Sequence, residues 1–391
     1  MNRSSELPYW AQLFYDAVKK EKRPERIPIF SNAWNWKIFD AGYTLSEALY
    51  DFKKETKAIE HYFREYPTDC MYETGTRNPF SFTQYFGSDK DYIIDDEKQI
   101  MSYVDRSYLD VSEYDDLIED PGRFIWEKLI PRKCHNIQKG MNGKTYIEGT
   151  FAFIKYVTAY QNLGKMLGKK FGAVTLYDAA APFYLMVGPD ILVDFIRGIK
   201  GTSVDMRRMP EKVKAACLAL DSVFEPDMSA YGGKDGHEMT CAFDGAMAFL
   251  AHTIFSAKQF DTYFMPYIRK AADFAMAHDK TVLIFSEGSA ERLYDLYRDL
   301  PKGYFCILPE TDDVFKMKKE LPNICIAGGM PSALLRSQSK EQCVAYAKRL
   351  CDEMGDDGGY IFSQDKMLSM PSDCRPENMK ATCEFVYSYR L

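Results

Sequence analysis

The C-terminal part of the chain repeats one pattern four times, a short apolar run followed by a stretch with helical spacing. The runs are TVLIFSEG (281–288), GYFCILPE (303–310), NICIAGG (323–329) and GGYIFSQD (358–365), and the helices are expected at 289–299, 312–320, 339–355 and 376–388. Runs that are apolar throughout are typical of strands covered by helices on one side and packed side chains on the other. Successive β/α units of this kind predict a parallel sheet.

A less regular alternation of strands and helices precedes these four units in the chain. It comprises a strand at AVTLYD (173–178), helices at 189–199 and 210–224, a strand near 237–243 and a helix at 256–278. Such units fit a barrel or a doubly wound sheet, but no G-x-G-x-x-G opens a helix, which disfavours the dinucleotide-binding fold. A chain of 391 residues without a linker suits a single barrel with insertions. We therefore expect one α/β domain over 1–391, a single (β/α)8 TIM barrel.

The first 150 residues are more irregular and read as an N-terminal extension. A short helix at 9–20, a strand at 27–30 and a helix at 46–65 are expected there. The segment 89–132 reads as short strands followed by an acidic loop and a helix, which is typical of an insertion. We place this insertion at about 85–135.

Composition excludes several classes of function. The 50 basic and 57 acidic residues give a net charge of −7, and no basic run is present, so nucleic acid is not an expected partner. The N-terminus lacks the apolar stretch of a secretory signal, and no apolar window is long enough to span a membrane. The ten cysteines form no C-x-x-C pair, as in proteins with reduced thiols. We expect a cytoplasmic protein without membrane contact.

The chemistry of a β/α barrel takes place at the C-terminal ends of its strands. Three apolar runs end in acids, which places Glu287, Glu310 and Asp365 around one rim. Converging carboxylates raise one another's pKa, so that one acts as an acid, or they bind a divalent metal. The alternative is that each acid caps the next helix.

Other residues are candidates for the same rim. His252 follows the apolar run GAMAFLA and is a candidate proton donor, or a metal ligand together with Glu287 and Glu310, although the spacing matches no compact zinc motif. A lone histidine is more often structural. Four further side chains at strand ends are candidates for substrate binding. They are Trp34, Trp36, Tyr72 and Asp178, and Asp365 joins them.

Three segments carry a family resemblance. SAKQFDTYFMPYIRKAADFAMAHDKTVLIFSEG, NICIAGGMPSALL and GGYIFSQDKMLSMPSDCRPENMKA, spanning 256–381, resemble the uroporphyrinogen decarboxylase superfamily. DFIRGIKGTSVDMRRMPEKV (194–213) extends the match more weakly. The resemblance implies a single TIM barrel with its pocket at the strand C-termini. That superfamily includes cofactor-free decarboxylases and corrinoid-dependent methyltransferases, so motifs must discriminate between these reactions.

The motifs depart from both branches. The decarboxylases carry an R-Q-A-G-R stretch for substrate carboxylates, whereas SNAWNWKIFDAG stands here without an arginine. Zinc methyltransferases of the superfamily carry H-x-C-G and a later Cys. Phe285 stands here at the His position, Glu287 at the first Cys, and Lys366 or Asp365 at the second. A thiolate zinc site is therefore not expected, although the remaining oxygen ligands could hold zinc differently.

The resemblance implies a methyltransferase that moves a methyl group between a small substrate and the cobalamin of a partner corrinoid protein. A methoxylated aromatic is the expected substrate. Glu287 stands where the zinc methyltransferases carry their first Cys, and it could protonate the leaving oxygen or polarise it through a metal. Two alternatives remain. One is a porphyrinogen decarboxylase, for which Arg207, Arg208 and Arg336 are the first residues to test. The other is a ligand-binding barrel without catalysis. A homodimer is only the default assembly.

Overall fold

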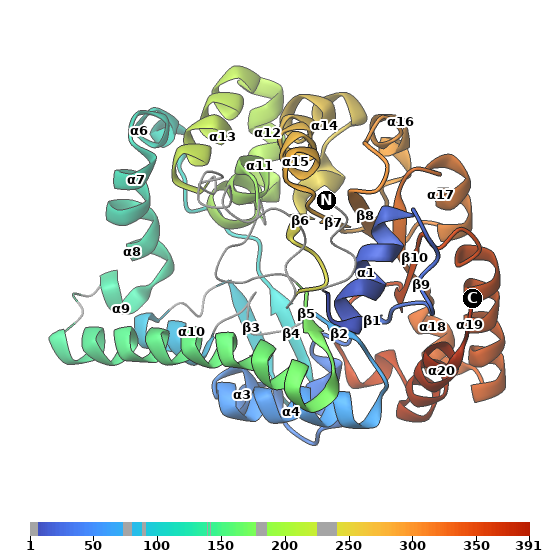
Figure 1. The fold of residues 1–391 in the computed structure, drawn as a ribbon. Helices are drawn as coiled ribbons and strands as arrows, with labels where there is room; N and C mark the ends of the chain where they lie inside the picture. The colour runs from blue at the N-terminus through green and yellow to red at the C-terminus, as the bar shows by residue number, and fades with distance from the viewer. Residues whose placement is uncertain are drawn as a thin grey trace.

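Parallel strands wrapped by helices form the centre of the structure, a computed structural model that describes residues 7–72, 80–87, 91–138, 140, 142–176, 186–224 and 241–391 (Figure 1). The parallel strands are β1 (Phe30–Ser31), β2 (Cys70–Met71), β5 (Val174–Thr175), β6 (Gly245–Phe249), β7 (Val282–Ser286), β8 (Phe305–Pro309), β9 (Cys325–Met330) and β10 (Tyr360–Gln364). Strands β6 to β10 pair in chain order, and β1, β2 and β5 form a second sheet.

Single parallel bridges join the two sheets at both edges. Ile29 pairs with Phe362 on one side, and Thr175 pairs with Cys241 on the other. The backbone N–H of Phe362 donates to the Pro28 carbonyl at 3.0 Å, and that of Ala242 donates to the Thr175 carbonyl at 2.8 Å. These bridges therefore link the eight parallel strands of the described residues at both edges, as in a barrel. The predicted α/β barrel is confirmed.

Side chains alternate between the inside and the outside of this barrel. On β7, Leu283 and Phe285 join an interior cluster made of strand residues, whereas Val282 and Ile284 pack with the covering helices. The helix α1 (Tyr9–Lys19) adds Phe14 to the interior cluster, where its ring lies 5.9 Å from that of Phe243. This helix closes the N-terminal end of the barrel.

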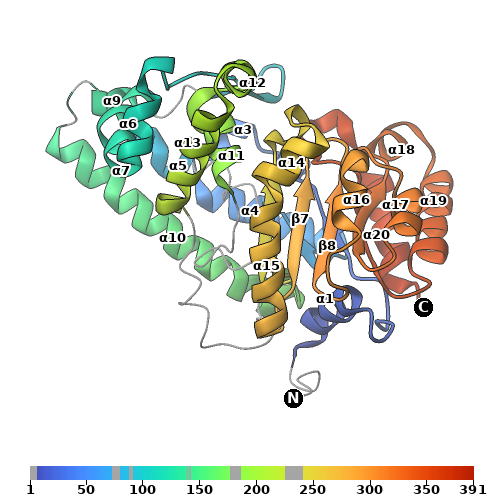
Figure 2. The same ribbon diagram turned by 90° about the horizontal axis from the view of Figure 1, so that it is seen from above.

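Helices cover the barrel on its outer side, and Figure 2 shows α17 to α20 on the side away from the short helices of residues 114–138. The long helices are α4 (Phe52–Glu65), α10 (Gly143–Phe171), α12 (Ile199–Arg208), α13 (Pro210–Phe224), α14 (Ala257–Tyr263), α15 (Met265–His278), α17 (Val314–Glu320), α19 (Lys340–Met354) and α20 (Pro376–Ser388). The short ones are α2 (Trp36–Asp40), α3 (Leu45–Leu49), α11 (Gly188–Asp190), α16 (Tyr294–Tyr297) and α18 (Ser332–Ser337). The helices predicted at 210–224 and 376–388 have these bounds.

Some predicted elements differ from the structure. The helix expected at 256–278 is two helices, because Pro266 lacks the N–H that would continue the first into the second. The one expected at 46–65 is also interrupted, and the Asp51 side chain accepts a hydrogen bond from the Lys53 N–H at the start of α4. Of the strand expected near 237–243, residues 237–240 lie outside the described residues, Cys241 forms a single bridge to Thr175, and β6 begins at Gly245.

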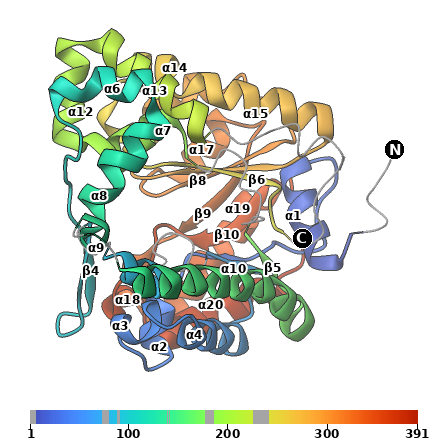
Figure 3. The ribbon, with the colours of Figure 1, turned by 90° about the vertical axis from the view of Figure 1, so that its left-hand side faces the viewer.

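The segment predicted as an insertion lies beside the barrel and keeps that name below. The hairpin of β3 (Tyr92–Asp95) and β4 (Ile100–Tyr103) precedes α6 (Tyr114–Glu119), α7 (Pro121–Phe124), a π-helix (Ile125–Leu129), α8 (Ile130–Lys133) and α9 (His135–Gln138). Figure 3 shows the hairpin next to α9, with the long helix α10 on the side that faces the viewer. α5 (Phe80–Thr83) packs against α10.

Candidate active site

A cavity of about 440 Å³ lies where β6, β7 and β8 end. Glu287 and Glu310 line it, as expected from their positions two residues beyond the interior side chains Phe285 and Leu308. Volumes of 300–1,000 Å³ are typical of small-molecule sites. The structure thus brings the two predicted rim acids together in the wall of one cavity.

A glycine turn sets the positions of these two acids. The backbone N–H of Gly288 donates to Glu310 Oε2 at 2.8 Å, while the N–H of Glu287 donates to the Phe249 carbonyl at 3.1 Å. Gly288 has a φ of +69°, which a residue with a side chain rarely adopts, and an added Cβ would lie 3.1 Å from Thr253 Cγ2. The turn after β7 therefore holds the Glu310 carboxylate against the residue that follows Glu287.

His252 is buried behind the cavity rather than in its wall. Its Nε2–H donates to the Glu287 carbonyl at 2.6 Å, and its Nδ1 accepts from Arg292 Nη2 at 3.2 Å. Burial lowers the pKa of His252 to about 4. The neutral ring therefore links two strand ends and is not among the described residues that line the cavity.

The predicted metal set does not come together. The described residues hold no group of three or more His, Cys, Asp or Glu side chains that could hold a metal ion. Both ring nitrogens of His252 are used in the hydrogen bonds to Glu287 and Arg292. Two carboxylates without a nitrogen or sulfur ligand are a poor zinc site. The described residues of this set therefore do not fit zinc.

The low pKa of His252 predicts an acid-dependent loss of stability. Its folded pKa of about 4 lies below the reference value of 6.5, so the unfolded chain binds a proton first as pH falls. We expect its contribution to be intact above pH 6.5 and to decline towards pH 4, with about 2 kcal/mol lost by pH 5. Urea unfolding of wild type and His252→Asn across this range measures the difference. If the free energy of unfolding changed with pH in the same way in both proteins, this role of His252 would be contradicted.

The predicted aromatic residues lie elsewhere. Trp34 and Tyr72 follow β1 and β2 and form a tilted pair with centroids 5.1 Å apart. Trp34 has a positive φ of 24°, a strained backbone for a residue with a side chain. Trp36 instead packs in the core against Tyr62 and Tyr66, with its Nε1–H donating to the Cys374 carbonyl. None of the three is among the described residues that line the cavity.

The remaining two candidates give different outcomes. Asp365 Oδ1 accepts from the backbone N–H of Ser332 at 2.9 Å, at the start of α18. Burial raises the pKa of Asp365 despite this hydrogen bond. Asp365 therefore holds the start of α18, a helix that precedes it in the chain, rather than capping the next helix. Asp178 and its strand end lie outside the described residues.

Two aspartates at the cavity were missed by sequence reasoning. Asp194 lines the cavity, and Asp190 is fully buried behind it, with Oδ1 accepting from the backbone N–H groups of Leu250 and Ala251 at 3.0 and 2.9 Å. Both come from the segment predicted as a helix at 189–199, of which Ile191–Arg197 is a π-helix. Two acids four residues apart in an apolar helix were the signal that could have revealed them.

The insertion is anchored to this π-helix. The carbonyls of Phe195 and Ile196 accept hydrogen bonds from Lys133 Nζ and from the N–H groups of Tyr108 and Leu109. The Tyr103 hydroxyl donates to the carbonyl of Asp194. The carbonyls at the end of a π-helix have no hydrogen-bond donors within the helix. The insertion supplies donors for these carbonyls. The cavity wall from Asp194 to Ile199 is thus fixed by the insertion.

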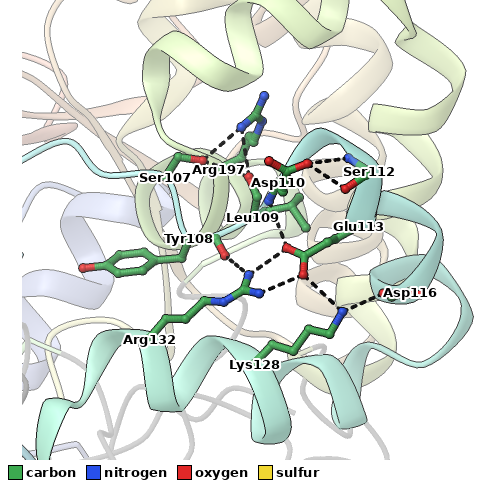
Figure 4. Close-up of polar contacts among 10 residues, drawn as sticks. All are labelled: Ser107, Tyr108, Leu109, Asp110, Ser112, Glu113, Asp116, Lys128, Arg132 and Arg197. Atoms are coloured by element: carbon green, nitrogen blue, oxygen red, sulfur yellow. Dashed lines mark hydrogen bonds and ion pairs between the residues drawn. The ribbon is translucent and has the colours of Figure 1, made fainter. Parts of the chain in front are cut away.

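Ion pairs hold the insertion in this arrangement, as Figure 4 shows. Arg132 forms a two-pronged pair with Glu113 at 2.7 Å and also donates to the Tyr108 carbonyl at 2.6 Å. Arg132 lowers the pKa of Glu113 to about 2. From the π-helix, Arg197 donates to the Ser107 hydroxyl and the Leu109 carbonyl. The insertion and the π-helix therefore behave as one unit at the cavity.

Comparison with known proteins agrees with this arrangement. Residues 179–389, more than half of the chain, match the family model of uroporphyrinogen decarboxylase (URO-D). The chain belongs to the URO-D family. The URO-D match contains β6 to β10 and both rim acids, so the resemblance expected from the sequence is confirmed.

A solved structure shares the fold over nearly the whole chain. A methyltransferase from Methanosarcina mazei is similar with a TM-score of 0.60 over 97% of this chain and 98% of that chain, at 12% sequence identity. At this identity the similarity concerns the fold. No curated protein matches the chain. In the part of this URO-D family protein that the structure describes, every helix is too short or too polar to cross a membrane.

Proposed function

We propose that this URO-D family protein is a methyltransferase that moves a methyl group between a small methoxylated aromatic and the corrinoid of a partner protein. The observation that carries the proposal is the pair of carboxylates, Glu287 and Glu310, at neighbouring strand ends in one cavity. The fold shared with a methyltransferase supports the same class of reaction.

Cleavage of a methyl ether places specific demands on the protein. The bond between oxygen and the methyl carbon breaks, both electrons stay on the oxygen, and the leaving phenolate takes up a proton. A reduced corrinoid would supply the nucleophile that accepts the methyl group. Glu287 would donate the proton to the oxygen, while Glu310, held by the Gly288 N–H, lines the same cavity. The apolar residues Leu250 and Ile254 in the cavity wall would exclude water.

The decarboxylase alternative has less support from the described residues. A porphyrinogen with several carboxylates needs cationic groups in the site. Arg207, Arg208 and Arg336 are all exposed, and none of them lines the cavity. The described residues therefore show no cationic clamp of the expected kind.

An anaerobic assay tests the proposal. The purified protein is mixed with cob(I)alamin and a panel of methoxylated aromatics and methylamines, with and without chelator, and formation of methylcobalamin is followed by its absorbance. We expect methylation with an aromatic ether that is insensitive to the chelator. A loss of activity with chelator would replace the acid mechanism by a metal-assisted one. No transfer, even with the native corrinoid protein added, would favour decarboxylation or ligand binding without turnover.

A further inference from the structure

We propose that the cavity selects its methoxylated aromatic by charge, preferring a ring that carries a cationic amine and rejecting a ring that carries a carboxylate. This inference rests on the methyl-transfer function proposed above, because it names the substrate class of the same cavity. Three observations carry it: the acidic residues in the wall, the effect of Asp194 on two neighbouring ionisable groups, and the aromatic rings on one side of the wall.

Three carboxylates line the cavity and no described cation does. Asp194 belongs to the π-helix, while Glu287 and Glu310 follow β7 and β8. None of the described residues in the wall is Lys, Arg or His. With Glu287 protonated as the general acid, a carboxylate brought into this space would still meet the negative charges of Asp194 and Glu310, which is unfavourable, whereas an ammonium group would be attracted.

The charge of Asp194 acts on two ionisable groups beside the cavity. Burial, followed by the charge of Asp194, raises the pKa of the Tyr103 hydroxyl, which is itself part of the wall. Burial, followed by Asp194, also raises the pKa of Asp190 behind the wall, and Glu287 adds to this. Both groups disfavour a further negative charge at this end of the cavity.

The insertion provides the surface for an aromatic ring. Tyr92 and Tyr103 of the hairpin line the cavity with ring centroids 5.4 Å apart at an interplanar angle of 57°. Phe195 and Ile199 continue the apolar wall on the side of the π-helix. Tyrosine faces bind both aromatic rings and cations. A ring against this wall would place a charged substituent near Asp194, because Tyr103 is hydrogen-bonded to the Asp194 carbonyl.

A matched ligand series tests the charge selection. The ligands are 3-methoxybenzylamine, 3-methoxybenzyl alcohol and 3-methoxybenzoate, which share the ring and the methoxy position and differ in charge. Binding to the full-length protein is measured by calorimetry without corrinoid, and demethylation is measured separately with cob(I)alamin. We expect the amine to bind about tenfold more tightly than the alcohol, and the benzoate to bind more weakly than the alcohol by a similar factor.

Salt and one variant identify the source of the preference. The ratio of the amine and benzoate affinities should fall at high ionic strength in the wild type, a result that needs no mutation. Asp194→Asn should reduce this ratio about tenfold, while the exposed control Asp295→Asn, 86% exposed, should leave it unchanged. Equal affinities, tighter binding of the benzoate, or no binding of any of the three ligands would overturn the inference.

The outcomes separate this inference from the proposed function. Binding in the expected order without demethylation would contradict methyl transfer and support the charge selection. Demethylation of all three ligands with similar kcat/KM would support methyl transfer and overturn the charge selection.

Discussion

Arg26→Leu is expected to lower the free energy of unfolding by about 3–5 kcal/mol, the largest stability effect that the structure predicts. Arg26 and Asp69 are 2% and 3% exposed and form a two-pronged ion pair with distances of 2.7 and 2.5 Å. Asp69 also accepts from the backbone N–H of Ile29 at 2.8 Å, next to the bridge that joins the two sheets. Loss of Arg26 would leave a buried carboxylate without its counter-charge.

Urea unfolding with Arg23→Leu as a control checks this result. Arg23 pairs with Asp356 at 2.8 Å, but these side chains are 52% and 78% exposed, so its loss should cost less than about 1 kcal/mol. The double variant Arg26→Leu/Asp69→Leu should regain part of the lost stability, because it removes both buried charges. If Arg26→Leu lowered the free energy of unfolding as little as Arg23→Leu does, the predicted stabilising role of the buried Arg26–Asp69 pair would be wrong.

Glu287→Gln is expected to slow methyl transfer by about 100-fold or more, which is the contribution of a positioned general acid. The amide keeps the size of the side chain but cannot deliver a proton to the leaving oxygen. Because the hydrogen bonds of the Glu287 backbone to His252 and Phe249 remain, the turn should keep its structure. The affinity for a neutral ligand should change little.

Single-turnover rates with Glu291→Gln as a control measure this effect. Glu291 lies four residues further along, is 55% exposed on its side chain and pairs with Lys316. Its variant should transfer methyl groups at the wild-type rate. If Glu287→Gln also kept the wild-type rate, the acid role of Glu287 would be lost.

The sequence predicted the barrel and its rim because both follow from local patterns. Strand runs such as TVLIFSEG are apolar on both faces, and the first polar inward position after such a run falls at Glu287. The same alternation places Glu310 after Leu308. These predictions needed only the periodicity of two in a strand and the rule that active sites lie at strand C-termini.

The rest of the site depends on contacts between distant segments. Tyr103 and Asp194 are 91 positions apart, and only the folded insertion joins them at the cavity. No local pattern distinguishes Tyr92 and Tyr103, which line the cavity, from Trp36, which packs in the core. His252 was placed at the correct strand end, but its burial and its two hydrogen bonds come from tertiary packing.

Transfer of one labelled methyl group tests the central claim most directly. The protein is mixed anaerobically with cob(I)alamin and an excess of 3-methoxybenzyl alcohol that carries a ¹³C-methyl ether, and ¹³C NMR follows the label. We predict that the label appears on methylcobalamin together with an equal amount of 3-hydroxybenzyl alcohol, and that Glu287→Gln suppresses both products. If the label stays in the ether, with the native corrinoid protein also present, this URO-D family protein is not the methyltransferase proposed here.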